Sequence, residues 1–189
     1  MESTICDVHF EYFDYYPSSY IQSSNPNVLL SEPKLASDNI KKFKQGIGQE
    51  WPIELVENSI NNLGLQEPNV DKSNIAFVCL PASKKANHEA RFKNFSESIC
   101  KYLGIQNGFD HLTIINEKDP KYSPFATKRN WNMESDLQFD SDFFEGKKVI
   151  LFDDIVTSGD SMRAFIYKLR SLGAKPVLCM SLLYTPKIF

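Results

Sequence analysis

The chain has 189 residues, of which 42% are hydrophobic and 24% are charged, and its formal net charge is −3. This composition is ordinary for one globular domain and argues against a dedicated nucleic-acid surface, which needs a clear excess of Lys and Arg. The sequence contains no run of about 18 apolar residues and begins with acidic and polar residues, so we expect neither a membrane span nor a signal peptide.

Four cysteines are scattered along the chain without a Cys-x-x-Cys spacing: Cys6, Cys79, Cys100 and Cys179. This spacing excludes a zinc knuckle built from neighbouring residues and argues against a disulfide framework in a chain of this size. The pattern is typical of a reducing compartment, so we expect a cytoplasmic protein.

Residues 1–37 are rich in aromatic side chains and in Ser, Asn and Pro, and the alternation in Val8–Tyr12 predicts a strand. Such an aromatic stripe is more typical of core cover or an interface than of a ligand site. Two helices follow. The first begins near Asp38 and ends at Gly46, and the second runs from Pro52 to Leu63.

The apolar run Ile75–Leu80 predicts a buried strand, and Pro81–Lys85 is the loop after it. The next helix presents a row of apolar residues on one face and ends at Gly104. A short strand is predicted for His111–Asn116.

Residues 117–146 show no sustained periodicity and predict a long, flexible loop. A buried strand then begins at Lys148, a helix covers Ser161–Leu172, and a last strand covers Val177–Tyr184. Alternating strands and helices favour an α/β fold, with a mainly parallel sheet and helices on both faces.

The most informative stretch is Lys148–Ser161, in which a buried strand delivers Asp153 and Asp154 and a short loop then leads into a helix. The loop residues are Thr157, Ser158, Gly159, Asp160 and Ser161. Backbone N–H groups and the positive end of the helix favour an anion here, most naturally a phosphate. The two carboxylates suit the hydroxyls of an attached sugar, or a divalent metal. The stretch therefore indicates a site for ribose 5-phosphate.

Apolar strands that end in Asp-Asp also occur in Walker B segments, response-regulator receivers and phosphatases. A Walker B strand works together with a Gly-x-x-x-x-Gly-Lys-Ser/Thr loop, which this sequence lacks. The phosphatases use Asp-x-Asp, whereas the pair here is contiguous. These readings are the weaker ones.

The order of apolar strand, Asp153-Asp154, two apolar residues and Thr-Ser-Gly-Asp-Ser closely resembles the signature of the type I phosphoribosyltransferases, which bind 5-phosphoribosyl-1-pyrophosphate (PRPP). The resemblance implies a Rossmann-like fold, with a small N-terminal hood over residues 1–37 and a transferase domain over residues 38–189. It also implies that the loop 157–161 holds the 5-phosphate, and that the two acids face the ribose and the Mg²⁺ carried with PRPP.

A second segment is similar to the pyrophosphate loop of the ComF branch of that family, where a strand ends in Val-Pro-x-Ser and Arg-Gly-Phe-Asn follows. The resemblance implies that Ala82, Ser83 and Lys84 bind pyrophosphate. A solvated loop edge is the alternative for Lys84. Arg91 belongs to the segment Arg91–Asn94, which matches the family pattern only imperfectly. The alternative for Arg91 is an ordinary charged residue on the surface of the helix. The ComF zinc module has no counterpart in this sequence.

Lys128 and Arg129 resemble the basic cluster of the family's flexible loop, which implies that they stabilise the departing pyrophosphate. A solvated basic turn is an equal alternative. Two residues depart from the family pattern. Asp160 replaces a small neutral residue, and capping the following helix is another role for it. Thr157 replaces an Asp of the hypoxanthine-guanine enzymes, which argues against that subgroup.

These features predict a phosphoribosyltransferase of nucleotide metabolism, a glycosyltransferase that moves ribose 5-phosphate from Mg-PRPP to a nitrogen acceptor and releases pyrophosphate. Its catalytic residues are predicted to be Asp153, Asp154, Lys128 and Arg129. One alternative is a nonenzymatic protein that senses PRPP or nucleotides, or a ComF-like accessory protein of DNA uptake. Another is a partner-binding protein with a degenerate site. The resemblance suggests a homodimer, and the acceptor is not indicated by the sequence.

Overall fold

The computed structural model describes residues 3–15, 32–62, 67–118 and 131–185. Its helices are α2 (Glu32–Lys44), α3 (Glu50–Asn62), α4 (Lys85–Leu103), α5 (Ser141–Phe144) and α6 (Asp160–Ser171), with short 3₁₀ turns η1 (Lys72–Asn74) and η2 (Phe109–His111). Its strands are β1 (Ser3–Ile5), β2 (Val8–Tyr15), β3 (Ile75–Cys79), β4 (Gln106–Asn107), β5 (Leu112–Ile114), β6 (Leu137–Phe139), β7 (Lys148–Val156) and β8 (Lys175–Tyr184).

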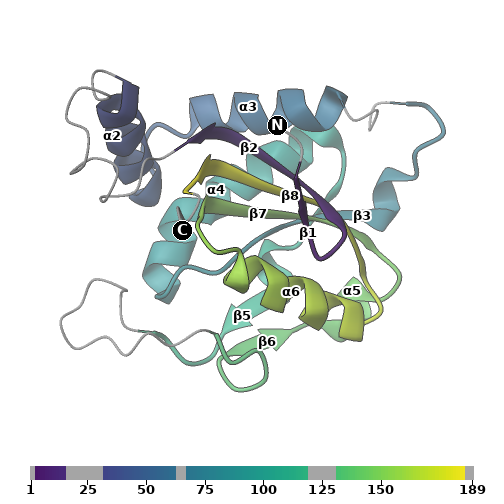
Figure 1. Cartoon of the computed structure of the whole chain (residues 1–189). Helices are drawn as coiled ribbons and strands as arrows, with labels where there is room; N and C mark the ends of the chain where they lie inside the picture. Colours follow the sequence, from purple (N-terminus) through teal and green to yellow (C-terminus); the bar gives the residue numbers. More distant parts are fainter. Residues whose placement is uncertain (1–2, 16–31, 63–66, 119–130, 186–189) are drawn as a thin grey trace.

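The main sheet has six strands in the order β1-β2-β8-β7-β3-β4 (Figure 1). Every pairing in it is parallel except that of β1 with β2. The turn that joins those two strands places Cys6 and Asp7 at φ 51° and 62°, the left-handed conformation that a tight two-residue hairpin needs. The predicted α/β class with a mainly parallel sheet is confirmed.

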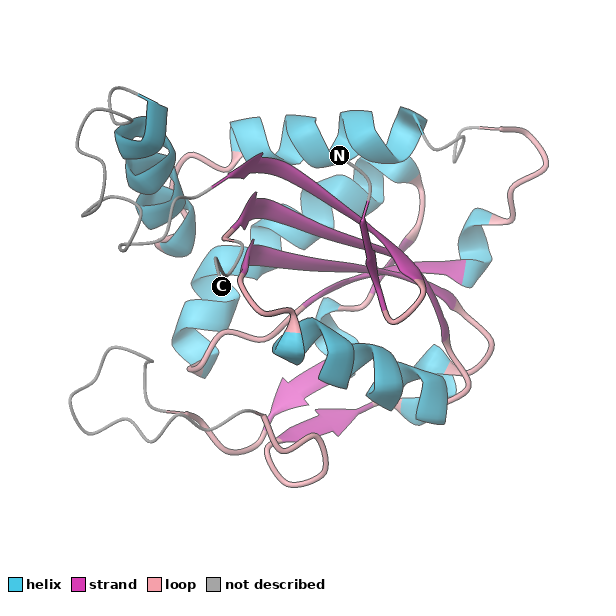
Figure 2. Cartoon of the chain, viewed as in Figure 1, coloured by secondary structure: helices cyan, strands magenta, loops and turns pink. Residues whose placement is uncertain are grey.

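Helices cover both faces of this sheet (Figure 2). The buried side chains of its strands divide between two cores, one on each face. Along β7, Val149 and Leu151 join a core that contains Phe165 of α6, whereas Phe152 joins a second core with Phe92 of α4. Because β7 is buried on both faces, its sequence is continuously apolar up to Phe152, as expected for a central strand.

Several regions differ from the sequence-based expectation. Helix α2 begins at Glu32 and not near Asp38, and the short strands β1 and β4 are not predicted by the sequence pattern. The strand predicted at His111–Asn116 is shorter and pairs antiparallel with β6 in a separate two-stranded sheet. Its register places Leu112 opposite Phe139, and β6 and α5 both lie in the segment 117–146 for which the sequence indicates a loop. Three- and four-residue elements carry too few residues for a periodic pattern, so sequence inspection does not find them.

None of the helices among the described residues is long and apolar enough to cross a membrane.

His88 of α4 is a buried polar residue whose surroundings have a consequence for stability. Its side chain stacks on Phe109 at 4.8 Å between ring centroids, and within the described part of the chain its two ring nitrogens have no hydrogen-bond partner. Burial, assisted by the positive charge of Arg91, lowers the pKa of His88 to about 4. The folded state therefore holds this histidine neutral.

We expect the protein to lose stability between about pH 6.5 and pH 4, because the unfolded chain protonates His88 more readily than the folded one. The loss attributable to this residue is about 3 kcal/mol at the acid end of that window. Urea unfolding of wild type and His88→Phe at pH 7 and pH 4.5 measures it. The variant should lose distinctly less stability on acidification, and equal losses would contradict the assignment.

Candidate functional site

The ends of β3 and β7 bring two predicted loops to one edge of the sheet. The strands are parallel neighbours, with Cys79 opposite Phe152, and the backbone N–H of Leu80 donates to the carbonyl oxygen of Phe152 at 2.8 Å. The residues that follow each strand therefore leave the sheet at its carboxyl end, where ligands of open α/β sheets bind. This geometry brings the loops 81–84 and 157–159 to the same edge of the sheet, near which β7 carries the acid pair.

Asp153 lies at this edge and is partly exposed. One of its carboxylate oxygens accepts the backbone N–H of Asp154 at 2.9 Å. Burial, followed by the negative charge of Asp154, raises the pKa of Asp153 well above its usual value. A carboxylate in such a position gains from any hydrogen-bond donor or cation that a ligand brings.

Asp154 is more deeply placed and is already bound by two cations. Its side chain is 7% exposed, and its Oδ2 atom lies 2.8 Å from Nη1 of Arg91 and 3.6 Å from Nζ of Lys44. Its Oδ1 accepts the backbone N–H of Ile155 at 2.8 Å. The structure thus joins β7, α4 and the end of α2 at one carboxylate.

Sequence reasoning identified neither cation as a partner of this acid. The sequence pattern places Arg91 either in a segment that binds pyrophosphate or on the surface of a helix. In the structure its side chain is 14% exposed and contacts Asp154, 63 residues away. Lys44 carried no signal at all. One clue existed for Arg91: it precedes Phe92 on the face of α4 that packs on the sheet, so its side chain starts close to the core.

The loop after β7 turns at Gly159, which has φ 74° and stands immediately before α6. This left-handed conformation favours glycine, because other residues have a Cβ that crowds the backbone there. Asp160 is the first residue of the helix. One of its carboxylate oxygens accepts the hydroxyl of Ser158 at 2.6 Å, and the other accepts Nη2 of Arg163 at 2.8 Å. Arg163 also donates to the carbonyl oxygen of Ser158 at 2.7 Å.

An anion at this helix start would therefore meet both favourable and unfavourable charge. The N-terminus of α6 and the N–H groups of the loop attract it, and Thr157 is exposed and Ser161 partly exposed beside them. Asp160 repels it, although Arg163 offsets much of that charge.

The loop after β3 contributes Ala82, which is buried, Ser83, which is partly exposed, and Lys84, which is exposed. The carbonyl oxygen of Ser83 accepts the N–H of Lys118 at 2.8 Å, so the chain runs alongside this loop just before residue 119. Lys128 and Arg129 lie outside the described residues.

A metal held directly by the protein does not fit these donors. Asp154 already has Arg91 and Lys44 as counter-charges, and Asp153 alone leaves most of the six oxygen ligands of Mg²⁺ to be found elsewhere. The described residues contain no group of three or more His, Cys, Asp or Glu side chains arranged to hold a metal ion.

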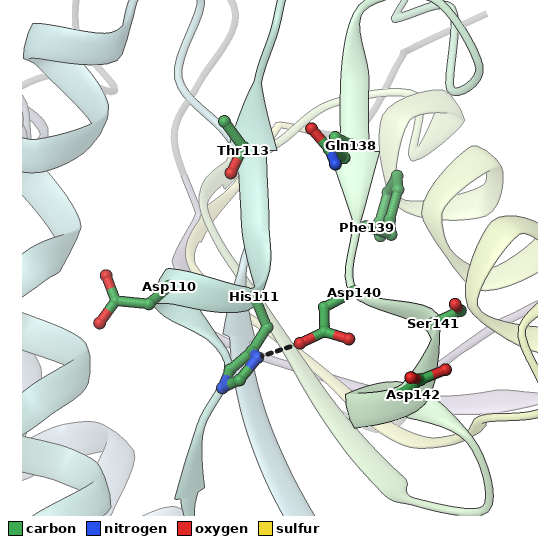
Figure 3. A pocket seen from close by; sticks show the side chains of 8 residues that line it. All are labelled: Asp110, His111, Thr113, Gln138, Phe139, Asp140, Ser141 and Asp142. Carbon is green, nitrogen blue, oxygen red and sulfur yellow. Dashed lines mark hydrogen bonds and ion pairs between the residues drawn. The ribbon is translucent and has the colours of Figure 1, made fainter.

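A separate hollow of about 430 Å³ lies against the β5–β6 sheet and not at the acid pair (Figure 3). His111 there contacts Asp140, with 2.8 Å between Nδ1 and Oδ2, and stacks on Phe143. The hydrogen bond from His111 holds the pKa of Asp140 below its usual value. This is a local hydrogen-bonded pair at the surface, and it is not part of the site at the carboxyl edge.

A comparison with known proteins bears on the family. A search against models of protein families finds no match. Over 92 residues the chain is 34% identical to the protein named Transcriptional regulator GfcR from Thermoplasma acidophilum. The aligned stretch covers 46% of this chain and 44% of that protein, so less than half of either is compared.

This similarity corrects the functional prediction. The assignments as a phosphoribosyltransferase, a glycosyltransferase, a ComF-like protein and an enzyme of nucleotide metabolism are wrong, because the similar protein is named as a transcriptional regulator. The sensing and DNA-uptake alternative gains no support either. The physical reason is that a strand–acid–loop motif of about a dozen residues predicts at most a binding site, and a binding site alone does not specify a reaction.

The two adjacent acids should respond oppositely to substitution. Asp153→Asn removes a charge that folding penalises and keeps an acceptor for the N–H of Asp154, so we expect stability at pH 7 to rise by on the order of 1 kcal/mol. Asp154→Asn leaves Arg91 without its partner and should cost about 3 kcal/mol. Thermal and urea unfolding measure both.

The pH dependence gives Asp153→Asn an internal control. A carboxyl group with a raised pKa in the folded state is destabilising above that pKa and not below its unfolded value near 4. The advantage of the variant should therefore shrink as the pH is lowered. A constant difference, or a loss of stability at pH 7, would show that the charge of Asp153 is not the cause.

Proposed function

We propose that this chain is a ligand-binding regulator of transcription that binds a phosphorylated, hydroxyl-bearing small molecule without chemical turnover. The regulatory part of the proposal is supported by the 34% identity to a protein named as a transcriptional regulator. The binding part rests on one observation, the edge where an anion-attracting loop and helix start follow directly after a carboxyl pair. The sheet is compatible with a Rossmann-like arrangement.

In this proposal the phosphate group binds at the N–H groups and hydroxyls of residues 157–161. The hydroxyls of the ligand donate to Asp153, whose raised pKa reflects a need for donors. Ala82, Ser83 and Lys84 lie at the same edge and would contact a second anionic group. PRPP stays a predicted ligand, and Mg²⁺, if bound, enters with the ligand. No step of the proposal needs a metal held by the protein.

We place the small-molecule site, and not the DNA contact, in the described residues. The net charge of −3 argues against strong electrostatic attraction of a duplex, since affinity for DNA depends on neutralising several phosphates. A homodimer remains a prediction. Cys6, Cys79, Cys100 and Cys179 are all free thiols, which supports our placement of the protein in the cytoplasm.

Isothermal titration with ribose 5-phosphate and with PRPP tests the site. We expect saturable binding by wild type and at least a tenfold loss in Gly159→Ala, because a Cβ strains the loop at φ 74° and shifts its N–H groups. Gly146→Ala is the matched control. Gly146 has φ 75° with nothing within 4 Å of an added Cβ, so it carries the same backbone strain away from the edge.

Absence of binding by folded wild type would contradict the ligand site. Release of pyrophosphate from PRPP in the presence of any amine or base would contradict the non-catalytic part of the proposal. An equal loss in both glycine variants would show that general strain, and not the loop, governs binding.

Asp160→Asn should strengthen binding of the phosphate. The substitution removes a negative charge from the first turn of α6. The single carboxamide oxygen can still accept from Arg163, and the Ser158 hydroxyl can accept from the amide N–H, so we expect affinity to rise roughly two- to fivefold at low salt. Asp142→Asn, which alters an acid in the first turn of α5, is the control and should change nothing. Weaker binding in Asp160→Asn would mean that Asp160 itself contacts the ligand.

A further inference from the structure

Lys44 is the outer of the two cations that bind Asp154. Its side chain is 37% exposed, against 14% for Arg91, while the carboxylate between them is 7% exposed. Its distance to the carboxylate is also the longer, 3.6 Å against 2.8 Å. Arg91 therefore holds Asp154 from the protein side, and Lys44 covers it from the solvent side.

Lys44 is also the last residue of α2, and that end of the helix is tightly placed. The preceding residue, Phe43, is fully buried against Phe95 of α4 and Phe152 of β7, with ring centroids 5.1 and 6.3 Å apart. The contact between Lys44 and Asp154 therefore lies directly beside the packed end of α2.

The chain just beyond α2 is held against the same part of α4. Gly46 has φ 75°, and a Cβ on it would lie 2.2 Å from the carbonyl oxygen of Ala90. The side chain of Gln49 donates to the carbonyl oxygen of Arg91 at 2.8 Å. The end of α2, the Ala90–Arg91 step of α4 and the acid of β7 thus form one connected unit.

We propose that Lys44 is an internal competitor for the acid pair, so that a ligand which binds Asp154 displaces Lys44 and loosens the end of α2. The proposal rests on the proposed function and names how binding at that site is transmitted. In the ligand-free state, the ammonium group of Lys44 occupies the solvent side of Asp154. In the bound state, a ligand hydroxyl takes that position and Arg91 stays in place.

The chemistry of the two cations makes Lys44 the one that leaves. Arg91 is nearly buried and donates at close range, so losing it would strand a buried charge. A lysine ammonium is a point charge on a flexible stem, and when partly exposed it is readily rehydrated. The coupling is reciprocal. If the ligand weakens the contact between Lys44 and Asp154 by some factor, then removing Lys44 strengthens ligand binding by the same factor.

The test uses the full chain, ribose 5-phosphate as the probe, and four proteins: wild type, Lys44→Ala, Lys44→Arg and Lys42→Ala. Titration gives the affinity, and hydrogen–deuterium exchange of residues 40–49 reports the end of α2. Lys42 is an exposed lysine of the same last turn and is the matched control. Lys44→Arg keeps the charge and should behave as wild type.

We expect Lys44→Ala to bind the probe about two- to fivefold more tightly and to exchange faster at the end of α2 before any ligand is added. Wild type and Lys42→Ala should reach that faster exchange on adding the probe. Unchanged or weaker binding by Lys44→Ala, or unchanged exchange in wild type with the probe bound, would overturn the coupling and leave the ligand site standing. Failure of folded wild type to bind the probe would overturn both.

Discussion

The pairing of β7 with β3 on one side and β8 on the other is the constraint from which the rest of the structure follows. A strand with two parallel neighbours and helices over both faces has no solvated side, so every residue from Val149 to Phe152 must be apolar. Asp153 and Asp154 are the first charged side chains after this apolar run. β7 continues past them to Val156, so both acids lie within the strand, where Asp153 is partly exposed and Asp154 is buried.

This position explains the electrostatics of the edge. Partial burial makes a negative charge on Asp153 unfavourable. The charge of Asp154 is instead neutralised by Arg91, which lies on α4, the helix that follows the neighbouring strand β3. The unfavourable carboxylate is the one that faces outward. Binding sites commonly retain such groups because a ligand that satisfies them gains affinity that a well-satisfied surface does not offer.

The sequence predicted what local patterns encode. Apolar runs marked β3, β7 and β8, glycines marked the ends of helices, and the order of acids, hydroxyls and Gly159 marked the loop before α6. The pattern carried no information on contacts between distant residues. The meeting of Lys44, Arg91 and Asp154 depends on how α2 and α4 pack over the sheet, and no spacing along the chain records it.

The error about the family has a related cause. The acid–loop motif predicts a phosphate site, and the structure shows that the loop turns at Gly159 into a helix. Whether a held ligand reacts depends on groups elsewhere, on what approaches the anomeric carbon and on what excludes water, and a dozen residues do not encode those. A binding motif of this length therefore does not identify the activity.

The margins of the main sheet limit how another protein can recognise this one. One outer strand, β1, has three residues and folds back through the tight turn at Cys6 and Asp7, and the other, β4, has two. Strands this short offer too little unpaired backbone to extend the sheet into a neighbouring molecule, which protects against aggregation and removes strand addition as a recognition mode. Within the described residues we therefore expect recognition to use side chains and not strand addition, and α2 is the helix whose end adjoins the acid pair.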